Sequence, residues 1–280
     1  MNLPKYTFNW KGAVALFAGG IFATLVLSVV AVGFQIILKK DIQNSGFFSI
    51  FSLAFMWIAV VAAFDYFVCR PETGKKLKFN FSSANFYTYF LIFPMMFGMM
   101  LIGDFAVSQI PTTGFFFEEY YKFFSGLMKE LTKNTFVMIA SVVIVAPIFE
   151  EIVFRGIIQK GLINGGMKPQ SAIWISSLIF GLVHGNPWQF AGAVLLGFVL
   201  GTVYHKTKSL LLPILLHFFN NLISLMLLEF SSSESFAQAF HISEWLTLII
   251  GIAIFSVFYY FFITKYKSGN KTLNIAGQTH

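Results

Sequence analysis

Eight runs of predominantly apolar residues dominate this sequence of 280 residues. A helix that crosses a bilayer needs roughly 20 such residues, because hydrocarbon offers no partner for its backbone hydrogen-bonding groups. The runs cover residues 12–38, 47–69, 86–108, 135–160, 170–186, 188–204, 209–229 and 243–264. The fifth and sixth runs are short, and the kink-prone sequence Gly185-Asn186-Pro187 joins them. The sequence therefore predicts an all-α polytopic membrane protein with about eight transmembrane helices.

The composition excludes an ordinary soluble domain. Hydrophobic residues make up 57% of the chain and charged residues 11%, whereas soluble domains carry about 25% charged residues. Cys69 is the single cysteine, so an intramolecular disulfide and a cysteine metal cluster are both excluded. The net charge is +7, but the basic residues stand at the ends of apolar runs. This pattern indicates membrane topology and a lipid partner, and we expect no nucleic-acid partner.

The distribution of basic residues predicts the orientation. Eight spans place both termini on one side of the membrane, and most basic residues fall on that side. They are Lys5, Lys11, Arg70, Lys75, Lys76, Lys78, Lys160, Lys168, Lys206, Lys208, Lys265, Lys267 and Lys271. The other side carries Lys39, Lys40, Lys122, Lys129 and Lys133, and Arg155 lies within a span. Since cytoplasmic loops are enriched in Lys and Arg, we expect a multi-pass protein of the cell membrane with both termini in the cytoplasm.

Ionisable residues inside a span are expensive and indicate function. The fourth run contains Glu150, Glu151 and Arg155 in apolar surroundings. Glu151 and Arg155 are four residues apart, so they share a helix face and are expected to pair. Glu150 is turned about 100° away and is neutralised less well. One carboxylate held by a partner beside another with a tunable pKa is the separation of roles that acid–base chemistry requires.

Two later runs supply histidine and asparagine. The fifth run ends with Phe180 and His184, and the seventh contains His217 and Asn221 on one helix face. Neutral histidine and asparagine can both donate hydrogen bonds to a developing oxyanion. A glutamate and a histidine that converge from different helices can hold a water molecule and take its proton. No serine or cysteine stands beside these residues as an obvious nucleophile, so the sequence favours activated water.

Structural interpretations of the same residues remain open. Glu151 and Arg155 are equally well explained as an ion pair that ties the helix to its neighbours. His184, taken alone, is more often a satisfied histidine between helices, and Asn220 is as easily a helix–helix contact as a functional group. The order of the three motifs, each in an apolar run of its own, favours the functional interpretation.

The three motifs resemble those of the CAAX-protease and bacteriocin-processing family, which includes the type II CAAX prenyl endopeptidases. The resemblance covers residues 135–230 and aligns the family's motifs with Glu150, Glu151 and Arg155, with Phe180 and His184, and with His217 and Asn221. It implies an intramembrane endopeptidase of eight helices. In such enzymes the first glutamate and the second-motif histidine hold the attacking water, and the third-motif histidine and asparagine stabilise the oxyanion.

The resemblance leaves the cofactor open, because the family has been described both as a metalloprotease and as a glutamate protease. By ligand count, Glu150, His184 and His217 are suited to zinc. The sequence has no HExxH motif, and a glutamate and a histidine can hold water without metal. We therefore expect no required cofactor, with zinc as the alternative.

The expected domains and function follow from this resemblance. Residues 1–134 form a three-helix membrane region with a segment at the membrane surface, residues 135–230 a catalytic core, and residues 231–280 a last helix and a polar tail. The expected substrate is a membrane-associated peptide or protein, in CAAX processing, peptide maturation or bacteriocin immunity. Two alternatives are a proton-coupled transporter, which also places carboxylates and histidines at mid-membrane, and a non-catalytic immunity or scaffold protein.

Overall fold

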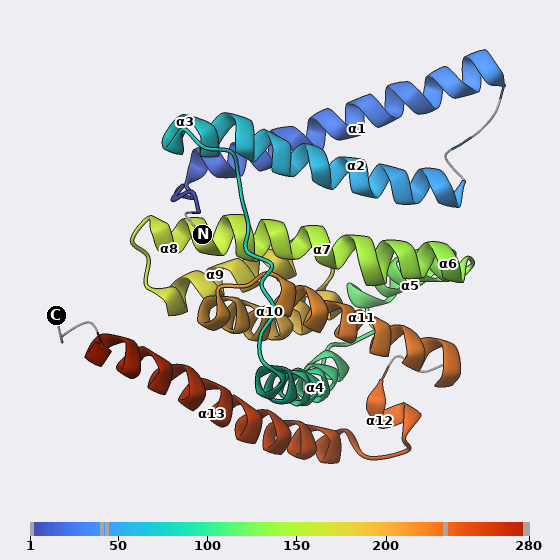
Figure 1. Ribbon diagram of the computed structural model, residues 1–280. Helices are drawn as coiled ribbons and strands as arrows, with labels where there is room; N and C mark the ends of the chain where they lie inside the picture. The colour runs from blue at the N-terminus through green and yellow to red at the C-terminus, as the bar shows by residue number, and fades with distance from the viewer. Residues whose placement is uncertain (1–2, 40–41, 43–44, 232–234, 277–280) are drawn as a thin grey trace. The chain divides into compact units, whose positions relative to one another are not determined.

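The computed structural model describes residues 3–39, 42, 45–231 and 235–276, and every regular element in this part of the chain is a helix (Figure 1). Lys40, which entered the charge distribution, lies outside the described residues. Seven of the described helices are long and apolar enough to cross a membrane. They span Trp10–Ile37, Gly46–Thr73, Phe86–Ser108, Thr135–Asn164, Pro187–Thr207, Leu211–Glu229 and Glu244–Lys267. The predicted all-α polytopic membrane protein is confirmed.

The fifth predicted span is shorter than expected. It forms α9 (Pro169–Leu182), a helix of 14 residues, and the backbone then turns. Gly185 adopts a left-handed φ of 69°, and the side chain of Asn186 caps the next helix by accepting the backbone N–H of Gln189. Pro187 takes the first helical position, where its missing N–H costs nothing. The kink predicted at Gly185-Asn186-Pro187 is therefore real, and it begins before His184.

The chain divides into two compact units. The first comprises Met1–Asn80 and Thr112–Ser176. Its elements are α1 (Trp10–Leu38), α2 (Gly46–Phe64), the π-helical η1 (Asp65–Cys69), α3 (Arg70–Thr73), α5 (Phe117–Thr132), α6 (Thr135–Met138), the π-helical η2 (Ile139–Val145), α7 (Ala146–Glu151), the π-helical η3 (Ile152–Gln159), α8 (Lys160–Asn164) and the start of α9. Helices α1 and α2 lie side by side (Figure 1), since Gly19 lets α1 approach the backbone of Val60.

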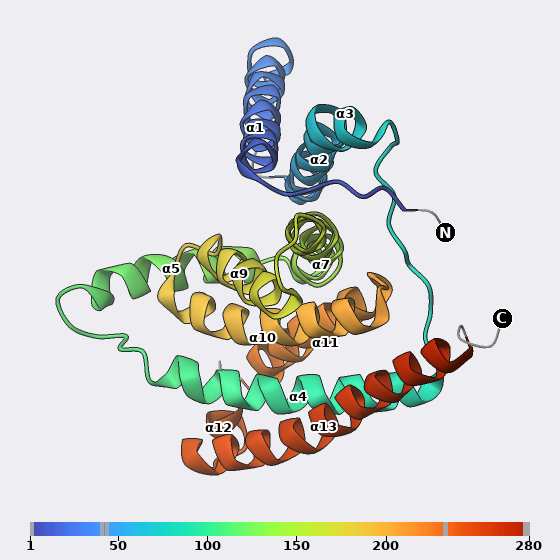
Figure 2. The same ribbon diagram turned by 90° about the vertical axis from the view of Figure 1, so that its left-hand side faces the viewer.

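The second unit comprises Phe81–Pro111 and Ser177–His280. It contains the end of α9 with α4 (Phe86–Ser108), α10 (Pro187–Thr207), α11 (Leu211–Ser231), α12 (Phe236–Ala239) and α13 (Glu244–Ala276). Its core joins α4, α10, α11 and α13 through residues such as Met95, Leu200, Leu216 and Phe262, all of them fully buried. Figure 2 shows α13 running along α4. Helix α13 continues to Ala276, so the segment predicted as a polar tail is helical up to that residue, and residues 277–280 lie outside the described part of the chain.

Two carboxylates near the ends of spans have structural partners. Asp65 forms an ion pair with Arg70 at 2.6 Å and also accepts the backbone N–H of Leu77 at 2.7 Å. Asp104 accepts the backbone N–H groups of Phe236 and Ala237 at the start of α12. These bonds fix loops to helix ends, so both carboxylates are explained without catalysis.

Glycine allows α4 and α13 to touch through their backbones. A Cβ atom at Gly98 would lie 2.6 Å from the backbone nitrogen of Phe255 and 2.9 Å from the carbonyl oxygen of Gly251. Small residues at such crossings let membrane helices gain packing contacts that lipid does not replace. We expect Gly98→Leu to separate these helices and to destabilise the protein by about 1–3 kcal/mol.

Thermal unfolding in detergent measures this effect. Gly33→Leu is the matched control, because a Cβ atom at Gly33 meets no atom within 4 Å. We expect the control to unfold at the wild-type temperature and Gly98→Leu to unfold several degrees lower. Equal unfolding temperatures for the two variants would contradict the proposed contact.

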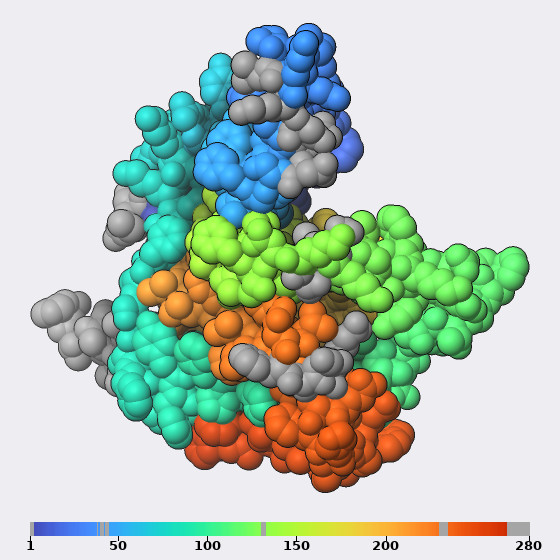
Figure 3. All heavy atoms as spheres, turned by 90° about the vertical axis from the view of Figure 1, so that its right-hand side faces the viewer, coloured from blue at the N-terminus to red at the C-terminus, as the bar shows by residue number. Residues whose placement is uncertain are grey.

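Helix α5 is amphipathic, as expected for the segment predicted at the membrane surface. Its exposed apolar side chains, Tyr120, Phe123 and Leu127, recur at helical spacing on one face. The helix lies in the green part of Figure 3. On the other face Lys122 pairs with Glu118 at 2.8 Å and with Glu119 at 3.0 Å, and its hydrogen bond and charge lower the pKa of Glu118 below the usual value. A helix with these two faces is suited to the boundary between lipid and water. Its location there stays a prediction.

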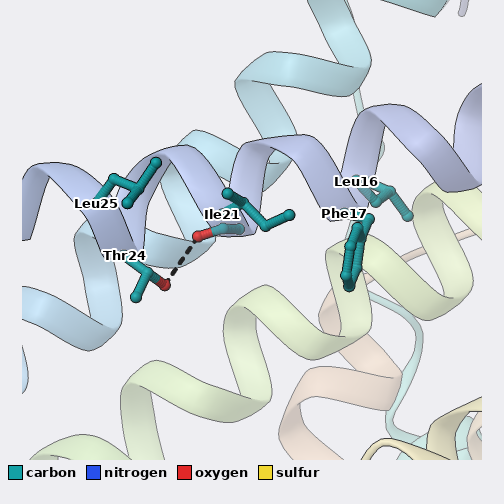
Figure 4. Close-up of a pocket in the computed structure, with 6 residues that line it drawn as sticks. Leu16, Phe17, Ile21, Thr24 and Leu25 are labelled. Atoms are coloured by element: carbon teal, nitrogen blue, oxygen red, sulfur yellow. Dashed lines mark hydrogen bonds between the residues drawn. The ribbon is translucent and has the colours of Figure 1, made fainter.

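A shallow hollow of about 410 Å³ lies along α1. It is lined by Leu16, Phe17, Gly20, Ile21, Thr24 and Leu25 (Figure 4). The one side-chain polar group in this lining, the Thr24 hydroxyl, donates to the carbonyl oxygen of Gly20 at 3.0 Å. The hollow offers no titratable group, so its surface is suited to lipid chains and not to acid–base chemistry.

Candidate active site

The first unit contains a fully buried ion pair. Arg155 donates from Nη1 to Oε1 of Glu151 at 2.7 Å, and both side chains have an exposed fraction of 0%. The pairing predicted from the four-residue spacing is confirmed. Moving two charges out of water costs several kcal/mol per ion, so such a pair persists only where its geometry is good. The pair gives the Glu151 carboxylate and the Arg155 guanidinium a charged partner inside the fold, and Glu150 stands next to it in the sequence.

Glu150 lies at a break in the regular helix. Helix α7 carries Glu150 and Glu151 and is only six residues long, with the π-helical η2 before it and η3 after it. Pro147 stands at the start of α7, where its ring and missing N–H disturb the helical hydrogen bonds. π-Helical turns inside longer helices occur frequently at functional sites. Glu150 is half-buried, unlike Glu151, so it combines a membrane-embedded position with access to the surroundings.

In the second unit, His184 occupies the turn between α9 and α10. Its Nδ1 lies 2.7 Å from the carbonyl oxygen of Phe180. Because a carbonyl oxygen only accepts, Nδ1 carries a proton in this bond, and this tautomer leaves Nε2 as the acceptor nitrogen. The side-chain amide of Asn186 donates to the His184 carbonyl oxygen at 3.1 Å, which holds the turn from the other side. The ring is therefore oriented with its acceptor nitrogen away from the backbone.

Phe180 brings the two motif histidines together. Its ring makes an edge-to-face contact with His184 at 5.0 Å between centroids and another with His217 at 5.6 Å. Phe180 is 2% exposed and His217 5% exposed, whereas His184 is half-buried. The aromatic residue of the second motif thus has a defined place: it packs against the histidine of its own motif and against that of the third.

Asn221 is oriented by its neighbour. It lies one turn after His217 on α11, and the side-chain nitrogen of Asn220 donates to its Oδ1 at 2.8 Å. Since the carbonyl end of Asn221 accepts this bond, its amide nitrogen is the end suited to donate to a substrate oxygen. Asn220 therefore supports Asn221, which is a more specific role than a contact between helices.

The predicted site residues fall into two groups. Glu150, Glu151 and Arg155 belong to the first unit, and His184, His217 and Asn221 to the second. Within either unit, the described residues contain no group of three or more His, Cys, Asp and Glu side chains that could hold a metal ion. The zinc set predicted from the sequence combines Glu150 with His184 and His217, and it stays a prediction.

The sequence did not single out two hydroxyl groups that bond to η3. Ser176 on α9 donates to the carbonyl oxygen of Phe154 at 2.8 Å, and Tyr6, before α1, donates to that of Gly156. Ser176 stands within an apolar run, and a polar residue in such a run is the one sequence feature that could have indicated its hydrogen bond. Tyr6 precedes the first span, and nothing in its sequence context indicated a contact with the fourth.

Comparison with known proteins agrees with the three motifs. Residues 132–223 match the model of the family described as type II CAAX prenyl endopeptidase Rce1-like, and this segment contains all three. The chain is also 35% identical over 119 residues to Putative membrane peptidase YdiL of Bacillus subtilis strain 168. This match covers 40% of the chain and 48% of the relative, so the chain spans about half the length of the curated relative. No solved structure matches the chain significantly.

The family match and the geometry concern the same residues. The resemblance noted over residues 135–230 corresponds to the matched segment 132–223. Within that segment lie the buried Glu151–Arg155 pair and the Phe180 ring that contacts both histidines. Residues 132–223 of this membrane protein accordingly match the family described as type II CAAX prenyl endopeptidase Rce1-like, in agreement with the resemblance that the motifs carry.

Proposed function

We propose that this protein is an intramembrane peptidase that hydrolyses a peptide bond of a membrane-associated peptide or protein with activated water. The observation that carries the proposal is the half-buried Glu150 beside the fully buried Glu151–Arg155 pair, within the segment that matches the endopeptidase family. An ion pair with a purely structural role would not account for the second carboxylate, which is expensive at membrane depth.

In the proposed mechanism Glu150 is the general base and His184 positions the water. As the resemblance to the family implies, the water is assigned to donate one hydrogen bond to the Glu150 carboxylate and another to His184, whose Nδ1 is engaged by the Phe180 carbonyl. Its oxygen attacks the peptide carbonyl carbon as Glu150 takes the proton. Glu150 then returns this proton to the leaving amine when the C–N bond breaks, so the enzyme ends in its starting state.

His217 and Asn221 are assigned to the oxyanion. Attack on the carbonyl moves negative charge onto its oxygen, and oriented donors in a water-poor site stabilise that charge strongly. The nearly buried His217 and the amide nitrogen of Asn221 are such donors. In this mechanism Arg155 and Glu151 do not exchange protons with the substrate. Their charges keep the helix that carries Glu150 in place.

By residue type alone, Glu150, His184 and His217 would also suit zinc. One carboxylate and two imidazoles form a set typical of catalytic zinc, which when bound would polarise water or the substrate carbonyl. The proposed mechanism works without it. We therefore expect peptide cleavage to survive thorough chelation with less than a twofold change in rate. Zinc bound in a one-to-one ratio, with activity lost on stripping and regained on zinc addition, would contradict this expectation.

The proposed substrate is a membrane-associated peptide, with no strict need for a prenyl group. The chemistry requires a peptide carbonyl, and the helices before residue 132 lie outside the matched family segment. The membrane location fits a substrate that partitions into lipid. We propose that both termini face the cytoplasm, on the basis of the basic residues at the span ends.

Cleavage assays in liposomes test the proposal. Purified wild type and Glu150→Ala are each given matched farnesylated and unprenylated C-terminal peptides, together with a library of hydrophobic peptides. We expect the wild type to cleave unprenylated members and Glu150→Ala to cleave none. Cleavage of the farnesylated peptide alone, after the modified cysteine, would restrict the substrate to CAAX peptides. No cleavage of any peptide by the wild type would favour a binding role in immunity instead.

A further inference from the structure

We infer that Tyr6 and Ser176 are positioning residues that hold the π-helical segment of the catalytic helix, and that residues 4–8 form a brace for it. The inference rests on the proposed function, since it concerns the placement of Glu150 and Arg155. Neither residue belongs to the three motifs, and Tyr6 lies far outside the segment that matches the family.

The two hydroxyl groups bond on either side of Arg155 in the sequence. Ser176 donates to the carbonyl oxygen of Phe154 at 2.8 Å, and Tyr6 donates to the carbonyl oxygen of Gly156. Both acceptors lie in η3, where the wider π-helical turn alters the ordinary pairing of carbonyl and N–H groups. The position of Arg155 is thus fixed from two directions by side chains of other segments.

Residues 4–8 are firmly seated on the first unit. The Tyr6 ring is fully buried and packs edge-to-face on Phe64 of α2 at 5.3 Å between centroids. Nζ of Lys160 lies 4.8 Å from the centre of the Tyr6 ring, and Asn164 of α8 donates to the Tyr6 carbonyl oxygen at 2.8 Å. The hydroxyl of Tyr6 is therefore held rigidly where it meets η3.

Two further contacts seat this segment. The backbone N–H of Thr7 donates to the Glu72 carboxylate of α3 at 2.8 Å. Phe8 packs directly on Gly161, where an added Cβ atom would lie 2.6 Å from the Phe8 Cβ and 2.8 Å from its backbone nitrogen. The segment thus contacts α2, α3 and the helix that carries Glu150, and glycine at position 161 is what allows the close approach.

Rigid placement matters because the proposed chemistry depends on small distances. Glu150 precedes Arg155 by five residues on the same continuous helix, and Arg155 holds Glu151 through the 2.7 Å bond. A shift of η3 would therefore move Arg155, and with it the two adjacent carboxylates Glu150 and Glu151. Misplacement of a catalytic group by about 1 Å can cost roughly 100-fold in rate. Tyr6 and Ser176 are accordingly expected to affect turnover more than substrate binding.

The test compares Tyr6→Phe, Ser176→Ala and the double variant with the wild type in liposomes, using the peptides cleaved by the wild type. Tyr6→Phe keeps the buried ring and removes only the hydroxyl. We expect kcat to fall about tenfold for each single variant and about 100-fold for the double variant, with KM changed less than about twofold. Tyr204→Phe, at a buried tyrosine of α10, is the matched control and is expected to keep wild-type kcat.

Glu72→Gln and Gly161→Ala test the brace without touching either hydroxyl. Glu72→Gln removes the charge of the exposed carboxylate that accepts the Thr7 backbone N–H and so weakens this hydrogen bond. Gly161→Ala adds a Cβ atom that clashes with Phe8 and displaces it. Both are expected to lower kcat several-fold at unchanged KM. Because they alter different atoms, agreement with Tyr6→Phe would assign the effect to the seating of residues 4–8.

Hydrogen–deuterium exchange supplies a readout that does not depend on activity. We expect faster exchange of the amides in residues 152–160 for Tyr6→Phe and Ser176→Ala, with the global unfolding temperature unchanged. Wild-type kcat and exchange in both variants would overturn the inference, as would a loss of activity that follows global unfolding alone. If the wild type cleaves no peptide while exchange still rises in the variants, the brace stands and the proposed function fails.

Discussion

Glu150→Gln is expected to abolish peptide cleavage while the protein still accumulates in the membrane at wild-type levels. Glutamine keeps the shape of the side chain, but its amide cannot take a proton from water at neutral pH. General-base catalysis contributes about 10²–10⁴ in rate, so kcat should fall about 100- to 10,000-fold. Because Glu150 is half-buried and the ion pair of Glu151 stays intact, folding should be unaffected.

The control for this variant is a glutamine at an exposed carboxylate. Glu118 lies on the polar face of α5 and pairs with Lys122 in solvent, so Glu118→Gln should retain wild-type activity. Cleavage rates in liposomes and membrane abundance measure the two effects separately. Wild-type-like cleavage by Glu150→Gln would exclude Glu150 as the base and would reassign the proton transfer to another group.

The sequence predicted the membrane spans well, because each depends on a local run of apolar residues. The pairing of Glu151 with Arg155 was equally accessible, since a spacing of four residues defines a helix face wherever the helix is intact. The kink at Gly185 was also predictable, because glycine followed by Asn-Pro favours a turn and a new helix start.

Features that depend on distant parts of the chain could not be predicted. The π-helical turns on either side of α7 are built from mostly apolar residues, as an ordinary transmembrane α-helix is, so the sequence pattern does not reveal them. Tyr6 is 150 residues away from Gly156, and Ser176 is 22 residues away from Phe154. The contact of Phe180 with both histidines likewise needs two helices to meet. In each case the partner is chosen by packing and not by spacing.

Arg155→Ala is expected to reduce the stability of the protein as well as its activity. The substitution removes the guanidinium that lies 2.7 Å from the Glu151 carboxylate, whose side chain has an exposed fraction of 0% in the wild type. Breaking a buried pair on one side typically costs 3–5 kcal/mol, because the remaining charge is no longer compensated. We therefore expect lower membrane abundance and a clearly lower unfolding temperature in detergent.

A double substitution separates the contribution of Arg155 to folding from any part in the chemistry. Replacing both members of a buried ion pair by apolar residues of similar size is often neutral for stability. Glu151→Leu combined with Arg155→Met should therefore recover much of the abundance lost by Arg155→Ala. If the recovered protein also regains part of its activity, the pair acts by supporting the helix that carries Glu150. An Arg155→Ala variant with normal abundance and unfolding temperature but no cleavage would show instead that the guanidinium takes part in the reaction, since it would then be dispensable for folding.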